Sequence, residues 1–173
     1  LKAVPITHAV SSQLSRAKAT AEFALGEARH GLLRIDERLQ EIAHGEWEGL
    51  LAQEIAERDP VTFRAWRDAP QTVQMPGGES IQQVLERAWQ GFAAACENLG
   101  ENDTLLLVAH DAVNRVLLCK ILGLDLDRLW AFRQAPTTLN LLEGESVDTL
   151  SVVRLNDCHH HTPLFGEALH RAL

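Results

Sequence analysis

Hydrophobic residues recur with helical spacing over residues 80–99, the longest such pattern in the sequence. The apolar face consists of Ile81, Val84, Leu85, Ala88, Trp89, Phe92, Ala95, Cys96 and Leu99. This spacing predicts an amphipathic helix that ends at Gly100. Residues 104–109 then form a continuous apolar run, which is typical of a strand buried on both faces of a parallel sheet. The two patterns together point to a helix packed against a sheet.

Shorter strand-like and helix-like patterns alternate along the rest of the chain. We expect strands at 8–11, 138–143 and 151–155, and helices at 13–25, 50–58, 111–122 and 126–132, with a helical turn at 61–68. Ser12 is the expected N-cap of the first helix, and 26–36 reads as a loop. This alternation predicts an α/β domain, and we treat residues 1–173 as a single domain.

Composition narrows the class of protein. The chain has 173 residues, 46% of them hydrophobic, and a formal net charge of −8. An acidic globular chain is a poor candidate for nucleic-acid or anionic-membrane binding. No apolar stretch approaches the ~18 residues of a membrane span. The three cysteines are far apart and form no CxxC pair, so we expect a reduced, cytoplasmic protein without a cysteine-rich zinc site.

Two positions share one design, in which a strand ends, a helix begins and a cationic or polar side chain lies at the junction. Arg16 falls in the first turn of the helix after the first strand, and His110 follows the buried strand directly. Helix N-termini favour anions, and ligands of α/β sheets bind at the carboxyl ends of strands. We therefore expect Arg16 and His110 to face one anion-binding crevice. Either residue alone would equally suit a solvated helix end or a surface cap.

Residues 38–49 form a third segment of interest, with acids, a histidine and a tryptophan around two glycines. Taken together with its neighbours, the chain resembles the phosphoglycerate-mutase-like branch of the histidine phosphatase superfamily. The resemblance rests on four motifs in order: SSxLxRAxxTA at 11–21, LxE…GxWEG at 39–49, PGGES at 76–80, and VxH…VxR at 108–115. It implies a three-layer α/β/α fold with a mostly parallel central sheet.

The resemblance also implies a phosphomonoesterase that forms a phosphohistidine. Arg16 matches a phosphate-binding arginine, His110 matches the second pocket histidine, and Glu41 matches the proton donor. We place Asp111 among the phosphate-binding residues, although the family has a small residue there. A carboxylate at this point would repel an anion, unless it serves the helix N-terminus instead. The expected substrate is a small phosphorylated metabolite, with no metal or cofactor and no nucleic-acid or membrane partner.

The family's nucleophile, on an Arg-His-Gly at the end of a central apolar strand, has no counterpart before residue 11. Arg29-His30-Gly31 spells the tripeptide but follows a helical pattern, so we do not expect His30 to be the nucleophile. We expect instead that the N-terminal central strand is missing from this chain. A homodimer, or another chain or segment, would then supply it. Alternatives are a non-catalytic phospho-ligand-binding domain or a structural half-domain.

Three further points follow from particular segments. Only 26 residues separate Gly49 from Pro76, which favours the shorter phosphatase branch over the mutases. Arg64, Trp66 and Arg67 suit equally the mouth of a pocket or a solvated helix face with a buried tryptophan. The run 158–161, one cysteine and three histidines, suits a polar tail better than a metal site.

Overall fold

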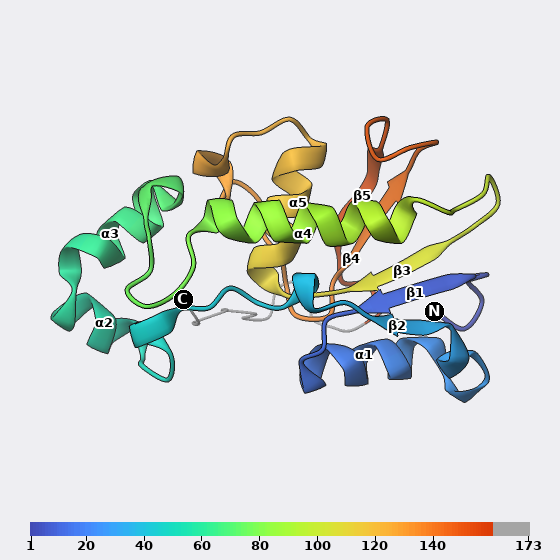
Figure 1. The fold of residues 1–173 in the computed structure, drawn as a ribbon, viewed down its shortest axis with the longest axis horizontal. Coiled ribbons are helices and arrows are strands. Elements are labelled where there is room, and N and C mark those ends of the chain that lie inside the picture. Colours follow the sequence, from blue (N-terminus) through green and yellow to red (C-terminus); the bar gives the residue numbers. More distant parts are fainter. Residues whose placement is uncertain (161–173) are drawn as a thin grey trace.

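The structure, a computed structural model, describes residues 1–160, and its centre is a parallel three-stranded sheet (Figure 1). The strand order is β2-β1-β3, with β1 at His8–Ser11, β2 at Leu33–Ile35 and β3 at Leu105–Val108. In the register, Ser11 lies opposite both Ile35 and Val108. All three strands therefore end at the same edge of the sheet, where the helices α1 and α5 begin.

Helices lie on both sides of this sheet, as the α/β/α expectation requires (Figure 1). On one side is α1 (Ser15–Leu25), and on the other are α4 (Ile81–Cys96) and α5 (Asp111–Ile121). The short helices α2 (Ala52–Arg58) and α3 (Pro60–Asp68) form a projection at one end, and β4 (Leu139–Glu143) and β5 (Ser151–Asp157) form a separate antiparallel hairpin. Single 3-10 turns occur at Glu27–Leu32, Glu37–Leu39, Gly45–Trp47, Pro70–Thr72 and Leu126–Arg128. The predicted mixed α/β fold is confirmed.

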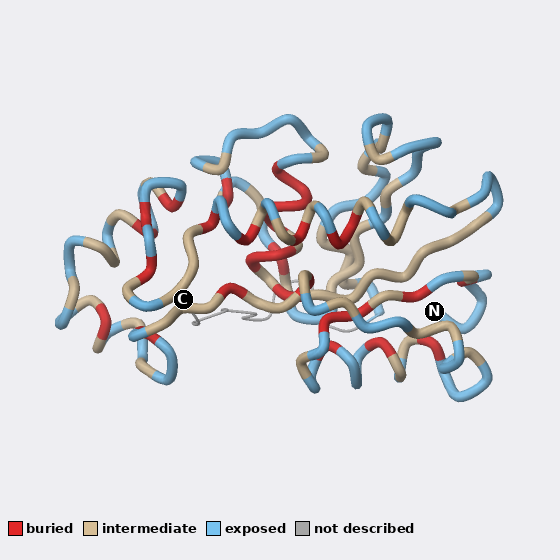
Figure 2. The backbone as a smooth tube through the Cα atoms, viewed as in Figure 1, coloured by how far each residue is buried: buried red, intermediate tan, exposed pale blue. Residues whose placement is uncertain are grey.

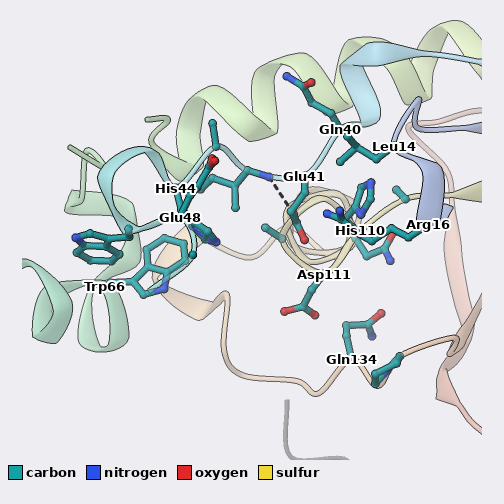
Figure 3. Close-up of a pocket in the computed structure, with 18 of the residues that line it drawn as sticks. Leu14, Arg16, Gln40, Glu41, His44, Glu48, Trp66, His110, Asp111 and Gln134 are labelled. Carbon is teal, nitrogen blue, oxygen red and sulfur yellow. Dashed lines mark hydrogen bonds between the residues drawn. The ribbon is translucent and has the colours of Figure 1, made fainter. Parts of the chain in front are cut away.

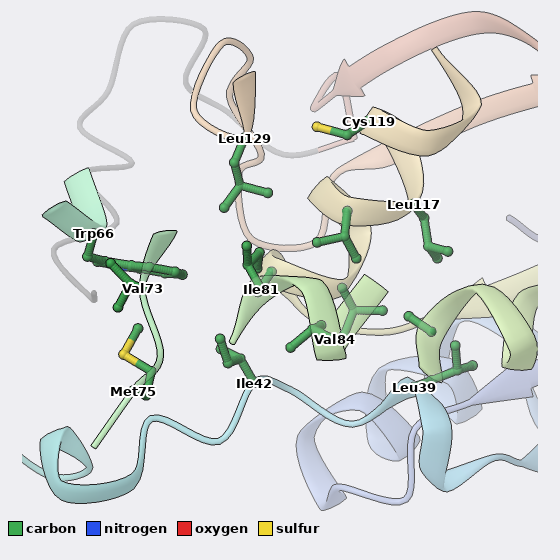
Figure 4. Close-up of a cluster of buried hydrophobic side chains, with 14 of the residues drawn as sticks. Leu39, Ile42, Trp66, Val73, Met75, Ile81, Val84, Leu117, Cys119 and Leu129 are labelled. Carbon is green, nitrogen blue, oxygen red and sulfur yellow. The ribbon is translucent and has the colours of Figure 1, made fainter. Parts of the chain in front are cut away.

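The main core lies between α4, α5 and the segment that crosses them (Figures 2 and 4). The helix α4 begins where its sequence pattern predicts, because Ser80 and Gln83 form a capping box at its N-terminus. Its fully buried positions Ile81, Val84 and Ala88 pack with α5 and with Leu39. Burying each large aliphatic side chain contributes about 1.5–3 kcal/mol. This face fixes where the preceding loop and α5 meet.

Several local predictions were wrong in instructive ways. Ser12 does not cap α1, which begins three residues later without a side-chain cap. The predicted loop at 26–36 contains β2, whose three residues carry too little pattern to be recognised. The predicted helical turn at 61–68 is a full helix, since Pro60 occupies its first turn and Asp59 accepts a hydrogen bond from the Thr62 N–H.

The burial of β3 also differs from its prediction. Its parallel pairing with β1 is as expected, but all four residues, Leu105–Val108, are only half-buried. The reason is that β3 is the outer strand of the three-stranded sheet, and β4 and β5 pair with each other rather than with it. An apolar strand thus has one backbone edge without a strand partner among the described residues. Within residues 1–160, no helix is long and apolar enough to cross a membrane.

Candidate active site

A cavity of about 850 Å³ opens at the carboxyl ends of β1 and β3 (Figure 3). All four residues singled out from the sequence line it: Arg16, Glu41, His110 and Asp111. They come from α1, from the extended segment before Gly45–Trp47, and from the junction of β3 with α5. The topology therefore brings together chemistry that is nearly a hundred residues apart in sequence.

His110 is held at the bottom of the cavity by a buried hydrogen bond. Its Nε2 lies 2.9 Å from Ser12 Oγ, and that hydroxyl also accepts the Leu14 N–H at 3.2 Å. Ser12, expected to cap a helix, thus orients the histidine instead. Burial lowers the pKa of His110 to about 4, and the nearby charges of Arg16 and Arg87 act in the same direction. The imidazole is therefore neutral at neutral pH and offers one N–H donor.

Arg16 supplies the positive charge of the cavity. Among the described residues that line the cavity, it is the only lysine or arginine. It lies in the first turn of α1, where the free N–H groups of the helix add a further attraction for anions. Its charge lowers the pKa of His110 and also opposes the upward shift at Glu41. Arg16, His110 and Glu41 therefore share one electrostatic environment.

Glu41 carries a carboxyl group whose pKa is raised. Burial is the main cause, and the charge of Asp111 adds to it. The N–H of Ile42, which donates to Glu41 Oε1 at 3.0 Å (dashed in Figure 3), the charge of Arg16 and the Ala112 N–H act against the shift. A carboxyl group that keeps its proton closer to neutral pH is suited to act as a general acid.

The carboxylate of Asp111 is paired and does not stand free in the cavity. Arg115, four residues further along α5, donates from Nε to both Asp111 oxygens at 3.0 Å. The same guanidinium lies 5.0 Å from the Trp130 ring centroid and donates to the Leu129 carbonyl oxygen at 3.2 Å. The positive charge of Arg115 thus offsets the negative charge that Asp111 introduces where the family has a small residue. A phosphate-binding role for Asp111 stays a prediction.

The Arg29-His30-Gly31 tripeptide lies away from the cavity. It belongs to the 3-10 turn Glu27–Leu32, and none of its residues lines the cavity. Arg29 donates to the carbonyl oxygens of Leu25 and Val4, and the His30 ring bonds the Glu22 carbonyl oxygen at 3.0 Å. These contacts hold the chain around the C-terminus of α1, and they give the tripeptide a structural role away from the cavity.

The outer wall of the cavity is more aromatic and amide-rich than the motifs suggested. It includes His44, Trp66, Trp130 and Gln134. Of the three residues left open at 64–67, only Trp66 reaches the wall and is 2% exposed, while the two arginines are exposed to solvent. Gln134 and Asn140 exchange two amide hydrogen bonds of 3.1 and 2.7 Å, so this wall is tied to β4. In the sequence, Trp66 was a candidate for the pocket mouth, and no signal pointed to Trp130 or Gln134.

Residues 1–160 contain no cluster of three or more histidine, cysteine, aspartate or glutamate side chains that could hold a metal ion. Cys158, His159 and His160 fall within this range. His161, the last residue of the candidate run, lies outside the described residues.

Comparisons with known proteins identify the family of the chain. The sequence profile of the histidine phosphatase superfamily (branch 1) matches residues 1–158. Phosphoserine phosphatase 1 of Hydrogenobacter thermophilus is 32% identical over 163 residues, which cover 94% of this chain and 75% of that protein. A probable phosphoglycerate mutase of Salmonella choleraesuis is 32% identical over 133 residues, covering 77% of this chain and 60% of the relative.

Solved structures give the same result. The Bacillus stearothermophilus protein YhfR superimposes with a TM-score of 0.83 at 31% identity, over 92% of this chain and 78% of that one. A mycobacterial glucosyl-3-phosphoglycerate phosphatase superimposes with a TM-score of 0.74 at 28% identity, over 88% and 78%. The fold and these relatives together define a histidine-phosphatase-type α/β enzyme. The chain belongs to branch 1 of the histidine phosphatase superfamily.

Proposed function

We propose that the protein is a metal-independent phosphomonoesterase that hydrolyses a small phosphorylated metabolite in the cytoplasm through a phosphohistidine. One observation carries the proposal: Arg16, Glu41 and His110 line one cavity at the carboxyl ends of two parallel strands. We further propose that residues 1–173 act as one domain. The relatives named above, a phosphoserine phosphatase and a sugar-phosphoglycerate phosphatase, support hydrolysis of this class of substrate.

In the proposed reaction, this chain binds the phosphoryl group and protonates the leaving group. Arg16 and the His110 N–H stabilise the charge on the equatorial oxygens, which is the main need of phosphoryl transfer. Glu41, whose pKa is raised mainly by burial, donates a proton to the bridging oxygen as the ester bond breaks. In this proposal Arg16 neutralises the negative charge of the phosphoryl group, so no metal ion is needed for that purpose.

The nucleophile is the part of the proposal that the described residues do not supply. We propose that it reaches the cavity on a strand that pairs with the free edge of β3, from another segment or from a second chain. A parallel strand at that edge ends beside His110, because the carboxyl ends of neighbouring parallel strands lie together. The half-buried apolar side chains of β3 favour this location.

The first experiment establishes the natural chain and its chemistry together. The protein made from its natural gene is analysed by intact mass and N-terminal sequencing, and then mixed rapidly with p-nitrophenyl phosphate in the presence of a chelator. We expect turnover and an acid-labile, base-stable phosphoenzyme on a histidine. Phosphate-competitive ligand binding without turnover would instead support a non-catalytic binding domain. Transfer of the phosphoryl group back to the product alcohol, rather than to water, would support the mutase alternative.

A further inference from the structure

An ion pair outside the cavity wall holds the segment that carries Glu41. Arg87, on α4, forms a two-bond fork with Glu79: Nε donates to Oε1 at 2.7 Å and Nη2 donates to Oε2 at 2.8 Å. The two side chains keep only 17% and 20% of their exposed surface. Neither residue lines the cavity described above.

The rest of the Arg87 guanidinium binds backbone on the other side. Nη1 donates to the carbonyl oxygens of Arg38 and Gln40 at 2.8 and 2.7 Å, and Nη2 donates to that of Glu41 at 3.2 Å. With the two bonds to Glu79, these contacts use every N–H of the guanidinium. Residues 40–43 form no helix or strand. Arg87 therefore gives the carbonyl oxygens of Gln40 and Glu41 the hydrogen-bond donors that a helix or sheet would otherwise supply.

Glu79 binds the same segment from its far end. Its Oε2 accepts the Ala43 N–H at 2.9 Å, and its own backbone N–H donates to the Ala43 carbonyl oxygen at 2.8 Å. The two backbones are in direct contact here, because a Cβ at Gly78 would overlap the Ala43 carbonyl oxygen and crowd the Gly45 nitrogen. Glu41 therefore lies between two fixed points, one at 38–41 and the other at 43.

We propose that Arg87 and Glu79 are positioning residues for Glu41: they fix its backbone so that its carboxyl group reaches the bridging oxygen of the substrate. The proposal rests on the proposed function, in which Glu41 is the general acid. Lysine cannot replace Arg87, since a single ammonium cannot bind two carboxylate oxygens and three carbonyl oxygens in this planar arrangement. A relaxed segment would also let water reach the carboxyl group, which faces Arg16 and Asp111 across the cavity.

The test uses the natural protein and compares R87K with E41Q. General acid catalysis matters most for a poor leaving group, so each protein is assayed with an alkyl phosphate and with p-nitrophenyl phosphate. We expect E41Q to lower kcat for the alkyl ester by about 10²–10³-fold and R87K by about 10–100-fold. Both should change kcat for p-nitrophenyl phosphate by less than about 5-fold. Equal losses on both esters in R87K would show a general structural effect and overturn the proposal.

The matched control is R38K. Arg38 makes the same kind of fork on the same segment of chain, but its side-chain hydrogen bonds go to Asp36 and not to the backbone of residues 40–43. We expect R38K to leave the ratio of the two kcat values unchanged. If R87K does not fold, as judged by thermal melting, E79Q takes its place, because it keeps the volume of the side chain while removing the charge of the fork.

A second readout needs no turnover and so separates this proposal from the proposed function. Glutamate labelled with ¹³C at the carboxyl carbon reports the titration of Glu41, assigned by its loss in E41Q. We expect the pKa of Glu41 to fall in R87K, because water then reaches a carboxyl group whose pKa is raised by burial. An unchanged titration would contradict the positioning role even if the enzyme is active. Conversely, a shifted titration in a protein that hydrolyses no ester would uphold the positioning of Glu41 while the proposed function failed.

Discussion

The two sides of the cavity are built in different ways. On the side of α4, the Glu41 segment is held by an ion pair, by backbone contacts at Gly78 and by a core whose members are fully buried. On the side of β3, the apolar strand is half-buried and one of its edges has no strand partner among the described residues. The side that carries the proton donor is complete, whereas the side that faces the proposed nucleophile is open. This difference is the reason for placing the proposed nucleophile strand at the edge of β3.

His110 stands where the two sides meet, and its removal is expected to have the largest effect. In the natural protein, His110→Ala removes a donor to the phosphoryl oxygens, and kcat should fall by about 10²–10³-fold. Steady-state kinetics with p-nitrophenyl phosphate measure this loss. His30→Ala is the control, because this ring is exposed, hydrogen-bonds the Glu22 carbonyl oxygen and does not line the cavity. This variant should leave kcat unchanged. Full activity of the His110 variant would refute its assignment.

The closed side can be broken without touching a catalytic group. In Gly78→Ala, the new Cβ would overlap the Ala43 carbonyl oxygen, so the free energy of unfolding should fall by about 3–4 kcal/mol. Gly31→Ala serves as the comparison, since nothing lies within 4 Å of its added Cβ and its stability should stay the same or rise by up to about 1 kcal/mol. Urea denaturation measures both. Similar stabilities for the two variants would mean that the backbones at 43 and 78 separate easily.

Stability should also depend on pH through His110. Its pKa is about 4 in the folded protein, against 6.5 ordinarily, so between these values the unfolded chain binds a proton that the folded protein does not. Its contribution is thus fully present above pH 6.5 and is lost as the pH falls toward 4, by at most about 3 kcal/mol. The difference in unfolding free energy between the original protein and His110→Gln, measured from pH 7 to 4, isolates this effect. A constant difference would contradict the lowered pKa.

The smallest effect is expected on the open side, for a substitution on β3. Leu107→Ala on half-buried β3 should cost about 1 kcal/mol, whereas Leu117→Ala on α5, where the side chain is 5% exposed, should cost about 3 kcal/mol. Denaturant unfolding of this chain compares the two. If a further strand pairs with β3 in the natural protein, the cost at Leu107 should rise there toward that at Leu117. An unchanged, small cost would argue against such a strand.

Sequence patterns predicted the elements whose stability is local or periodic. The helix α4 was recognisable because its apolar face repeats over several turns and Ser80 caps it. The strand–helix junctions likewise predicted that Arg16 and His110 face one crevice, because such junctions of a parallel sheet collect at one edge. Glu41 was assigned to the same site only by the resemblance to the family. By contrast, β2 was missed, since three residues provide almost no periodicity and its strand conformation comes from pairing with β1.

What the sequence did not predict depends on contacts between distant segments. The PGGES motif was visible, but nothing in it showed that Glu79 would pair with Arg87, or that Arg87 would donate to the carbonyl oxygens of 38–41. Ser12 suggested a helix cap, and its bond to His110 joins residues 98 positions apart. The half-burial of β3 was unpredictable for a similar reason. An apolar run shows that a strand can be buried on both faces, but the elements packed beside it determine how much of its surface is covered.

The tryptophans around the cavity have a practical consequence for following ligands. The chain has four tryptophans and no tyrosine. Three of the four, Trp47, Trp66 and Trp130, line the cavity, and the fourth, Trp89, packs on Phe92 within α4. Most of the strongly fluorescent side chains of the protein therefore lie beside the site. Intrinsic fluorescence can report the arrival of inorganic phosphate or an ester without any attached dye, and Trp89 provides an internal reference.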